Sequence, residues 1–225
     1  MNSNAEPPLR RRDEARAIFR NAILDAAEAV FAERGFHGAR IQDIAERART
    51  AVGTVYNHFE DKDDVLGARL EQRSEEMIAQ LHPVEDDRGP FDVRLRVRVA
   101  RVLSYVQAHR AFFAIANEQG LFAGTVAPGA HATHKRLRHV ERLRAVFDAL
   151  VEEGLASGDL EPLPGDALAR FLGGTIRAFV LSSIAQRTAD VNDDATTIVD
   201  LFLHGAARRK SSRRPKVLRK PAAGQ

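Results

Sequence analysis

The chain has 225 residues, of which 44% are hydrophobic and 29% are charged, and it contains no cysteine. This length and apolar content allow a buried core and exclude a disordered chain, while the lack of cysteine excludes disulfides and thiolate metal sites. No run approaches the roughly 18 apolar residues of a membrane span, and the basic N-terminus lacks the apolar stretch of a secretory signal. The sequence therefore predicts a soluble, cytoplasmic protein without membrane contact. The net charge of +3 is unevenly distributed, because residues 208–225 carry eight Lys and Arg residues and no acid.

The first 12 residues are polar, contain two prolines and end in Arg10, Arg11 and Arg12. They predict a flexible basic arm, whose arginines either contact DNA or belong to a solvated leader. A long helix is expected next, over residues 13–34, with Gly35 at its end. Its apolar face consists of Phe19, Ile23, Ala27, Val30 and Phe31.

The stretch IQDIAERARTAVGTVYNHF, residues 41–59, has the pattern of two short helices joined by a turn. The apolar face of the first consists of Ile41, Ile44, Ala45 and Ala48, which recur at helical spacing. That pattern breaks at residues 49–51, and a second helix is predicted over residues 52–58, with Val55 directed inward. Two short helices joined in this way form a helix-turn-helix, whose second helix enters the DNA major groove.

Residues 53–59, GTVYNHF, followed by Asp61, Lys62, Asp63 and Leu66, resemble the operator-binding motif of the tetracycline-repressor (TetR) family of bacterial transcription regulators. The resemblance covers residues 13–70, with weaker similarity over residues 194–207. It implies an all-α fold, in which an N-terminal three-helix helix-turn-helix DNA-binding domain precedes a C-terminal helical ligand-binding and dimerisation domain.

Three positions depart from the family pattern. Arg40 replaces the usual Thr that caps the first helix of the motif, Arg49 replaces the usual turn Gly, and Ala51 replaces a common Ser. Arg in a left-handed turn costs roughly 1 kcal/mol more than Gly, so Arg49 either accepts that cost or the turn changes. Thr50 is expected to cap the second helix in place of residue 51.

Beyond the motif, Asp61 is expected to cap a helix over residues 62–81, which in the family joins the DNA-binding head to the regulatory domain. Further helices are predicted at residues 91–109, around 112–122, and at 133–154, 165–186 and 192–208, giving about nine in all. The arginines of the helix at 91–109 are expected to form a solvated face. The expected division is a basic arm at 1–12, a DNA-binding domain at 13–70, an effector-binding and dimerisation domain at 71–207 and a disordered basic tail at 208–225.

Several residues of the motif are candidates for DNA contact. Val52, Thr54 and Asn57 are expected to face the bases, because Asn pairs with adenine and the methyl groups of Val and Thr contact thymine. Gly53 permits close approach of the backbone. Tyr56, His58 and Lys62 resemble the phosphate-contacting positions of the family, and a core position is the other possibility for Tyr56. Arg40 and Arg49 flank the motif and either contact DNA or remain in solvent.

A single recognition helix reads too few base pairs for a genomic site, so a two-fold homodimer on a near-palindromic double-stranded operator is expected. The expected dimer interface consists of Phe171, Leu172, Ile176, Phe179, Ile198, Leu201 and Phe202. Many of these residues also suit the core of a single chain. The candidate effector pocket consists of Tyr105, Phe112, Phe113, Leu121, Phe122, Phe147 and Phe179. These residues also suit a plain core, and their character favours an apolar or aromatic effector.

No cofactor, metal or catalytic site is predicted. The spacing of His131, His134 and His139 suits a shared metal poorly, and the chain has neither a Gly-rich phosphate loop nor a nucleophile motif. The sequence therefore predicts a ligand-responsive transcriptional regulator, a repressor in the first place. The alternatives are an activator or a chromosome-organising protein of the same fold, and from another class an α-helical enzyme or ligand carrier, which would leave the motif unexplained.

Overall fold

The computed structural model describes residues 8–84, 87–120, 133–163, 165–185 and 190–205, and for residues 8–15 and 133–140 it describes the backbone alone. Its helices are α1 (Pro8–Gly38), α2 (Ile41–Arg47), α3 (Val52–Tyr56), α4 (Lys62–Ala79), α5 (Phe91–Ala108), α6 (Arg110–Glu118), α7 (Thr133–Ser157), α8 (Ala167–Ala185) and α9 (Val191–His204). No strand occurs within these ranges. The prediction of an all-α chain with about nine helices is confirmed for the described residues.

The first helix begins earlier than predicted. It starts at Pro8, so residues 8–12 are helical and the expected arm up to residue 12 is wrong for them. Proline suits the first turn of a helix, because the N–H that it lacks has no partner inside the helix there. Gly35 ends the regular helix as expected, since its φ of 67° lies in the left-handed region that favours glycine.

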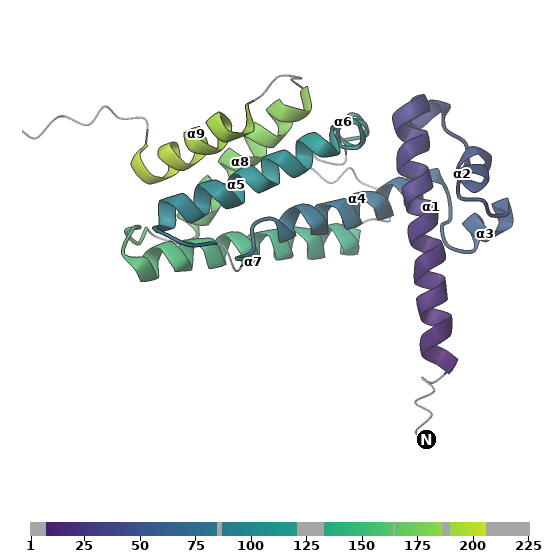
Figure 1. Cartoon of the computed structure of the whole chain (residues 1–225), viewed down its shortest axis with the longest axis horizontal. Coiled ribbons are helices and arrows are strands. Elements are labelled where there is room, and N and C mark those ends of the chain that lie inside the picture. Colours follow the sequence, from purple (N-terminus) through teal and green to yellow (C-terminus); the bar gives the residue numbers. More distant parts are fainter. Residues whose placement is uncertain (1–7, 85–86, 121–132, 164, 186–189, 206–225) are drawn as a thin grey trace, which may run out of the picture.

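α1, α2, α3 and the start of α4 pack into a small head (Figure 1). Its core consists of buried side chains from each helix, among them Ile23, Phe31, Ile44, Val55, Phe59, Val65 and Leu66. Phe19 was expected on this buried face but is 55% exposed. In Figure 1 the N-terminal end of α1 projects past α2 and α3.

α4 leads out of the head as one continuous helix into a bundle formed with α5 to α9 (Figure 1). Asp61 caps it as predicted, because the Asp61 carboxylate accepts the N–H of Asp64 at 2.8 Å. α5 lies inside the bundle and contacts α4, α6, α7, α8 and α9. Its buried residues Leu95, Val99 and Leu103 belong to one continuous apolar core that reaches into the head.

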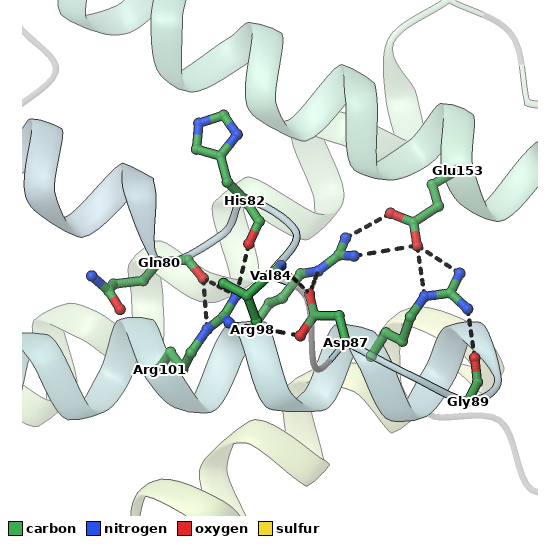
Figure 2. Close-up of polar contacts among 9 residues, drawn as sticks. Gln80, His82, Val84, Asp87, Gly89, Arg98, Arg101 and Glu153 are labelled. Atoms are coloured by element: carbon green, nitrogen blue, oxygen red, sulfur yellow. Dashed lines mark hydrogen bonds and ion pairs between the residues drawn. The ribbon is translucent and has the colours of Figure 1, made fainter.

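The connection between α4 and α5 is fixed by arginines of α5 (Figure 2). Arg98 pairs with Asp87 at 2.7 Å and with Glu153 of α7 at 2.6 Å. Arg101 donates to the carbonyl oxygens of Gln80 and His82, at 2.7 and 2.8 Å, which closes the C-terminal end of α4. The expectation of a solvated arginine face is therefore wrong for Arg98, which is buried and paired with two carboxylates.

Candidate nucleic-acid interface

The turn between α2 and α3 places Arg49 in the left-handed region, where glycine is favoured. Arg49 has a φ of 53°, and it is the one non-glycine residue with a positive φ in the described part of the chain. The N–H of Thr50 donates to Ala45 O at 2.9 Å, which closes the turn. The predicted Thr50 cap is wrong, because α3 begins after Ala51, whose extended backbone occupies the cap position without a side-chain bond.

Arg40 occupies the N-cap of α2, with an extended backbone. Its N–H donates to the Asp43 carboxylate at 3.1 Å, which is one half of a capping box. The other half requires an acceptor on residue 40, and a guanidinium group has none. Arg40 is therefore exposed beside the motif rather than used as a cap.

The second helix of the motif directs the candidate DNA-reading residues away from the core. Gly53, Tyr56 and Asn57 are exposed, Val52, Thr54 and His58 are half-buried, and Arg49 is exposed at the preceding turn. Val55 and Phe59 are buried at 0% and 3% exposure, as predicted. The Tyr56 ring is 54% exposed, which does not fit the alternative of a core aromatic.

A shallow hollow of about 340 Å³ lies where the starts of α2 and α4 meet Tyr56. Its lining consists of Ala39, Arg40, Ile41, Gln42, Tyr56, Glu60, Asp61 and Lys62. The hollow thus brings together three of the residues that the sequence singled out for DNA contact, namely Arg40, Tyr56 and Lys62.

Lys62 has a second set of partners that the sequence did not indicate. Its Nζ donates to Phe36 O at 2.7 Å and to Ala39 O at 3.1 Å, and it lies 4.4 Å from the centre of the Phe36 ring. These contacts tie the start of α4 to the segment between α1 and α2. The ammonium group thus holds the head together, whatever it does toward DNA.

Two arginines beside the motif were missed by the sequence analysis. The guanidinium of Arg20 lies 5.3 Å from the centre of the Phe59 ring. Burial, followed by the positive charges of Arg16 and Arg20, lowers the pKa of His58, so both arginines act on this imidazole. The available sequence signal was their i, i+4 spacing on the first helix, which places them on one face.

The head meets the regulatory domain through a junction cluster, formed by Asp25 and Glu28 of α1, Arg69, Arg73 and Glu76 of α4, Tyr105 of α5 and the adjoining His109. Glu28 accepts from Arg69 at 2.5 Å and pairs with Arg73 at 2.8 Å, and His109 Nδ1 lies 3.3 Å from its other oxygen. Arg69 is only 3% exposed and also pairs with Asp25 at 2.7 Å. Sequence alone gave no sign of this cluster, because its members are far apart in the chain.

The junction cluster continues toward the predicted effector pocket. Arg73 pairs with Glu76 at 2.7 Å, and the Tyr105 hydroxyl donates to the same carboxylate. Burial and this bond to Glu76 raise the pKa of Tyr105 to about 12, so the hydroxyl remains a donor at neutral pH. Burial alone would raise the pKa of Glu28, but the hydrogen bonds and charges of Arg73 and Arg69 outweigh it and hold that pKa below its usual value.

The residues of the predicted pocket separate into two groups. Tyr105, Phe112 and Phe113 form adjacent ring pairs, with centroids 6.3 and 5.9 Å apart. Phe147 packs on α8 instead, where a Cβ added to Gly173 would lie 2.8 Å from its ring. Phe179 is half-buried, and Leu121 and Phe122 lie outside the described residues. A hollow of about 500 Å³ between α5 and the ends of α4 and α9 includes Tyr105 but none of the phenylalanines.

The residues of the predicted dimer interface also fall into two groups, one buried and one partly or fully exposed. Leu172, Ile176 and Ile198 are at most 4% exposed and Phe202 is 8% exposed, because α8 and α9 pack on each other and on α5. The structure therefore assigns these four side chains to the core of a single chain. Phe171 is 52% exposed, and Phe179 and Leu201 are half-buried.

α8 is unusually apolar for a helix with a free face. Of the described helices, it is the one long and apolar enough to cross a membrane by length and composition. Its buried positions are Ala169, Leu172, Ile176, Val180, Ser183 and Ile184. Phe171, Gly174 and Ala178 lie exposed on the remaining side and form an apolar strip of the helix, where the Phe171 ring also stacks on Phe202 of α9.

Metal binding finds no support among the described side chains, where no group of three or more His, Asp or Glu residues is close enough to hold an ion. The side chains of His131, His134 and His139 lie outside that part of the chain.

Comparison with known proteins places the motif in a family. Residues 23–68 match the model for bacterial regulatory proteins of the tetR family. The chain is 26% identical over 188 residues to the HTH-type transcriptional repressor DhaR of Mycobacterium sp. (strain GP1), covering 82% of this chain and 92% of DhaR. It is 24% identical over 189 residues to the fatty acid metabolism regulator protein of Bacillus subtilis (strain 168), covering 81% and 93%.

The fold has solved counterparts. The crystal structure of the transcriptional regulator FadR from Bacillus subtilis in complex with stearoyl-CoA superposes with a TM-score of 0.67 at 22% identity, covering 83% of this chain and 98% of that one. The helix-turn-helix geometry, the all-helical fold and relatives named as transcriptional regulators agree with one another, and none of these relatives is named as an enzyme. Residues 23–68 therefore form a DNA-binding domain of the tetR family, and the chain is a DNA-binding transcriptional regulator.

Proposed function

We propose that this protein is a cytoplasmic, ligand-responsive repressor that binds a near-palindromic operator as a homodimer. The observation that carries the proposal is the outward face of α3, where exposed Tyr56 and Asn57 stand beside a buried Val55. Asn57, Val52 and Thr54 are assigned to base contacts, and Gly53 to close approach of the backbone. Tyr56 and His58 are assigned to phosphates, with Arg40 and Arg49 at the edges of the site.

The apolar strip on α8 supports the homodimer. Phe171, Gly174 and Ala178 follow helical spacing and are exposed, and Phe171 stacks on Phe202 of α9 with centroids 6.3 Å apart. A small-residue strip beside an exposed aromatic ring allows two helices to approach closely across a two-fold axis. The half-buried Phe179 and Leu201 would extend this surface. The proposed domain boundary near residue 70 lies inside α4, so each head is carried on a helix shared with its dimerisation domain.

The proposed effector is apolar, and in particular a long acyl chain. The regulatory domain contains the adjacent rings of Phe112, Phe113 and Tyr105. Both comparisons with Bacillus subtilis point the same way, since the sequence match is named as a fatty acid metabolism regulator and the structural match, FadR, was solved with stearoyl-CoA. The phenylalanines are closed against each other, so an acyl chain would have to separate them to enter.

The junction cluster is the physical route by which such an effector would reach the head. Tyr105 lies against Phe113 and donates to Glu76, which pairs with Arg73, which pairs with Glu28 of α1. A ligand that displaces Tyr105 therefore changes the partners of α4 and α1 together. The effector acts by preferring the displaced state, and a preference of a few kcal/mol is enough to shift the population.

The proposal is tested by gel shift with DNA from upstream of the gene itself, with and without stearoyl-CoA and other lipophilic compounds. A sequence-preferring complex that one of these compounds releases is the expected result. A protein that stays monomeric and prefers no duplex over random competitor would contradict the proposal. Persistence of the complex with every compound would favour a chromosome-organising role, and increased transcription from the bound promoter would favour an activator.

The division of labour on α3 has its own test. Asn57→Ala should change the order of preference among operator variants, with about 1–3 kcal/mol lost at the base it reads. Tyr56→Phe should weaken binding by a similar factor on every sequence, because it removes a phosphate contact. Equal losses on all sequences for both variants would refute the assignment of Asn57 to bases.

A further inference from the structure

The N-terminal half of α1 presents two arginines to the segment that follows α3. Arg16 and Arg20 are one helical turn apart and therefore share a face of α1. The Arg20 guanidinium lies over the Phe59 ring at 5.3 Å, which places this face of α1 beside Phe59. The charges of both arginines act on His58, the neighbour of Phe59.

Like Arg40 and Arg49, these two arginines lack the carboxylate partner that three other arginines of the head have in the described chain. Arg34, Arg47 and Arg69 each pair with a carboxylate at 2.5–2.7 Å. In the part of the chain that the structure describes, Arg16 and Arg20 pair with none, although Arg16 is exposed and Arg20 half-buried. Two guanidinium groups and an imidazole thus lie close together without a carboxylate partner among the described side chains, and such a group of positive charges attracts a polyanion.

The location of these side chains beside α3 indicates which polyanion they bind. Asn57 and Tyr56 are exposed on the adjacent turn, and α1 extends past α2 and α3 toward its N-terminus (Figure 1). A duplex seated on α3 would therefore continue beside this half of α1. Guanidinium groups bind phosphate oxygens through paired N–H donors, so the DNA backbone is the matching ligand.

We propose that Arg16 and Arg20, together with His58, form a second DNA contact that binds backbone phosphates beside the base pairs read by α3. The contact rests on the proposed DNA binding and extends it from the motif onto the first helix. It adds affinity that depends on salt and not on base sequence, because phosphates are the same at every step.

The test compares the double variant Arg16→Gln/Arg20→Gln with the wild-type protein on a duplex that the wild type has enriched from a random library. Binding is measured by fluorescence anisotropy between about 50 and 200 mM salt. The slope of log K against log salt should fall by about 1 for each arginine in each subunit, hence by about 4 in a dimer. The order of preference among operator variants should stay the same.

The matched control is Arg88→Gln/Arg144→Gln, which removes the same charge from an exposed loop and from α7. It should leave the slope unchanged. Loss of the Arg20–Phe59 contact could unfold the head, and the single variant Arg16→Gln covers that case, because Arg16 is exposed and pairs with no carboxylate in the described chain. That single variant should lower the slope by about 2 in a dimer.

A folded double variant, or a folded Arg16→Gln protein, with the wild-type slope would overturn the inference and leave the proposed function standing. An equal fall in the control would also overturn it, because the effect would then follow net charge and not the position on α1. A wild-type protein that enriches no duplex would remove the inference and the proposed function together.

Discussion

Arginines occur in two opposite settings in this molecule. In the junction cluster and between α5 and α7 they are buried and fully paired, as with Arg69 and Arg98 at 3% exposure, each within 2.7 Å of two carboxylates. Around the recognition helix Arg16, Arg40 and Arg49 are exposed and pair with no carboxylate in the described chain. The same residue type therefore fixes helices in one region and stays available for a partner in the other.

The difference has an energetic reason. A buried arginine is tolerated only when its charge and hydrogen bonds are matched, so removal of one partner leaves a costly charge behind. An exposed arginine contributes little to folding, because water screens it and its side chain keeps its freedom. Substitutions in the first set should therefore change stability, and substitutions in the second should change binding to a polyanion.

The largest loss of stability is expected from Arg98→Ala. The substitution leaves Asp87, whose side chain is 3% exposed, without the partner at 2.7 Å that compensates its charge. Breaking a buried pair in this way costs about 3–5 kcal/mol. The free energy of unfolding from urea titration at a fixed protein concentration measures it. Arg88→Ala, in the same connection but exposed, should change it by less than about 0.5 kcal/mol; similar losses in both would contradict the comparison.

Glu28→Gln comes next, with an expected loss of about 2–3 kcal/mol, since Arg69 and Arg73 both lose their shared charged partner. The control is Glu33→Gln, whose pair with Arg47 is about half exposed on each side and is worth at most about 1 kcal/mol.

The loss in Glu28→Gln should also depend on pH. Because the folded-state pKa of Glu28 lies below 4.5, its stabilisation is complete above about pH 4.5 and disappears as the pH falls through the folded-state value. The gap between variant and wild type should thus be full at pH 7 and narrow in acid. A gap that stays constant down to the acid transition would show that charge is not its cause.

Lys62→Met should destabilise the protein by about 2 kcal/mol, because Phe36 O and Ala39 O lose a charged donor inside the head. The variant separates two roles that the sequence left combined. If Lys62 holds the head together, the thermal stability of the variant falls. The salt slope of its DNA binding then stays as in the wild type when it is measured well below the melting temperature. A slope lower by about 1 per subunit with unchanged stability would assign the ammonium group to a phosphate instead.

The sequence predicted what depends on local pattern. Helical spacing located the helices, and the apolar positions Ile44, Val55 and Phe59 located the core of the motif. It could not predict contacts between distant segments: Glu28 and Arg73 are 45 residues apart, and Lys62 reaches carbonyls at residues 36 and 39. The sequence could least distinguish dimer and pocket residues from core residues, because an apolar residue such as Leu172 or Phe112 follows the same pattern in a core, an interface or a pocket.

The smallest effect is expected for Arg49, the exposed arginine beside the recognition helix whose backbone is strained. Arg49 has a φ of 53°, where glycine is favoured over other residues by about 1 kcal/mol, so Arg49→Gly should stabilise the protein by up to that amount. Arg49→Ala removes the same charge and keeps the strain, and it should leave stability nearly unchanged. If both variants lose DNA affinity equally while only the glycine gains stability, the Arg49 side chain is retained for DNA and the turn carries its conformational cost. A glycine variant that binds DNA as the wild type does would show that the side chain has no such role.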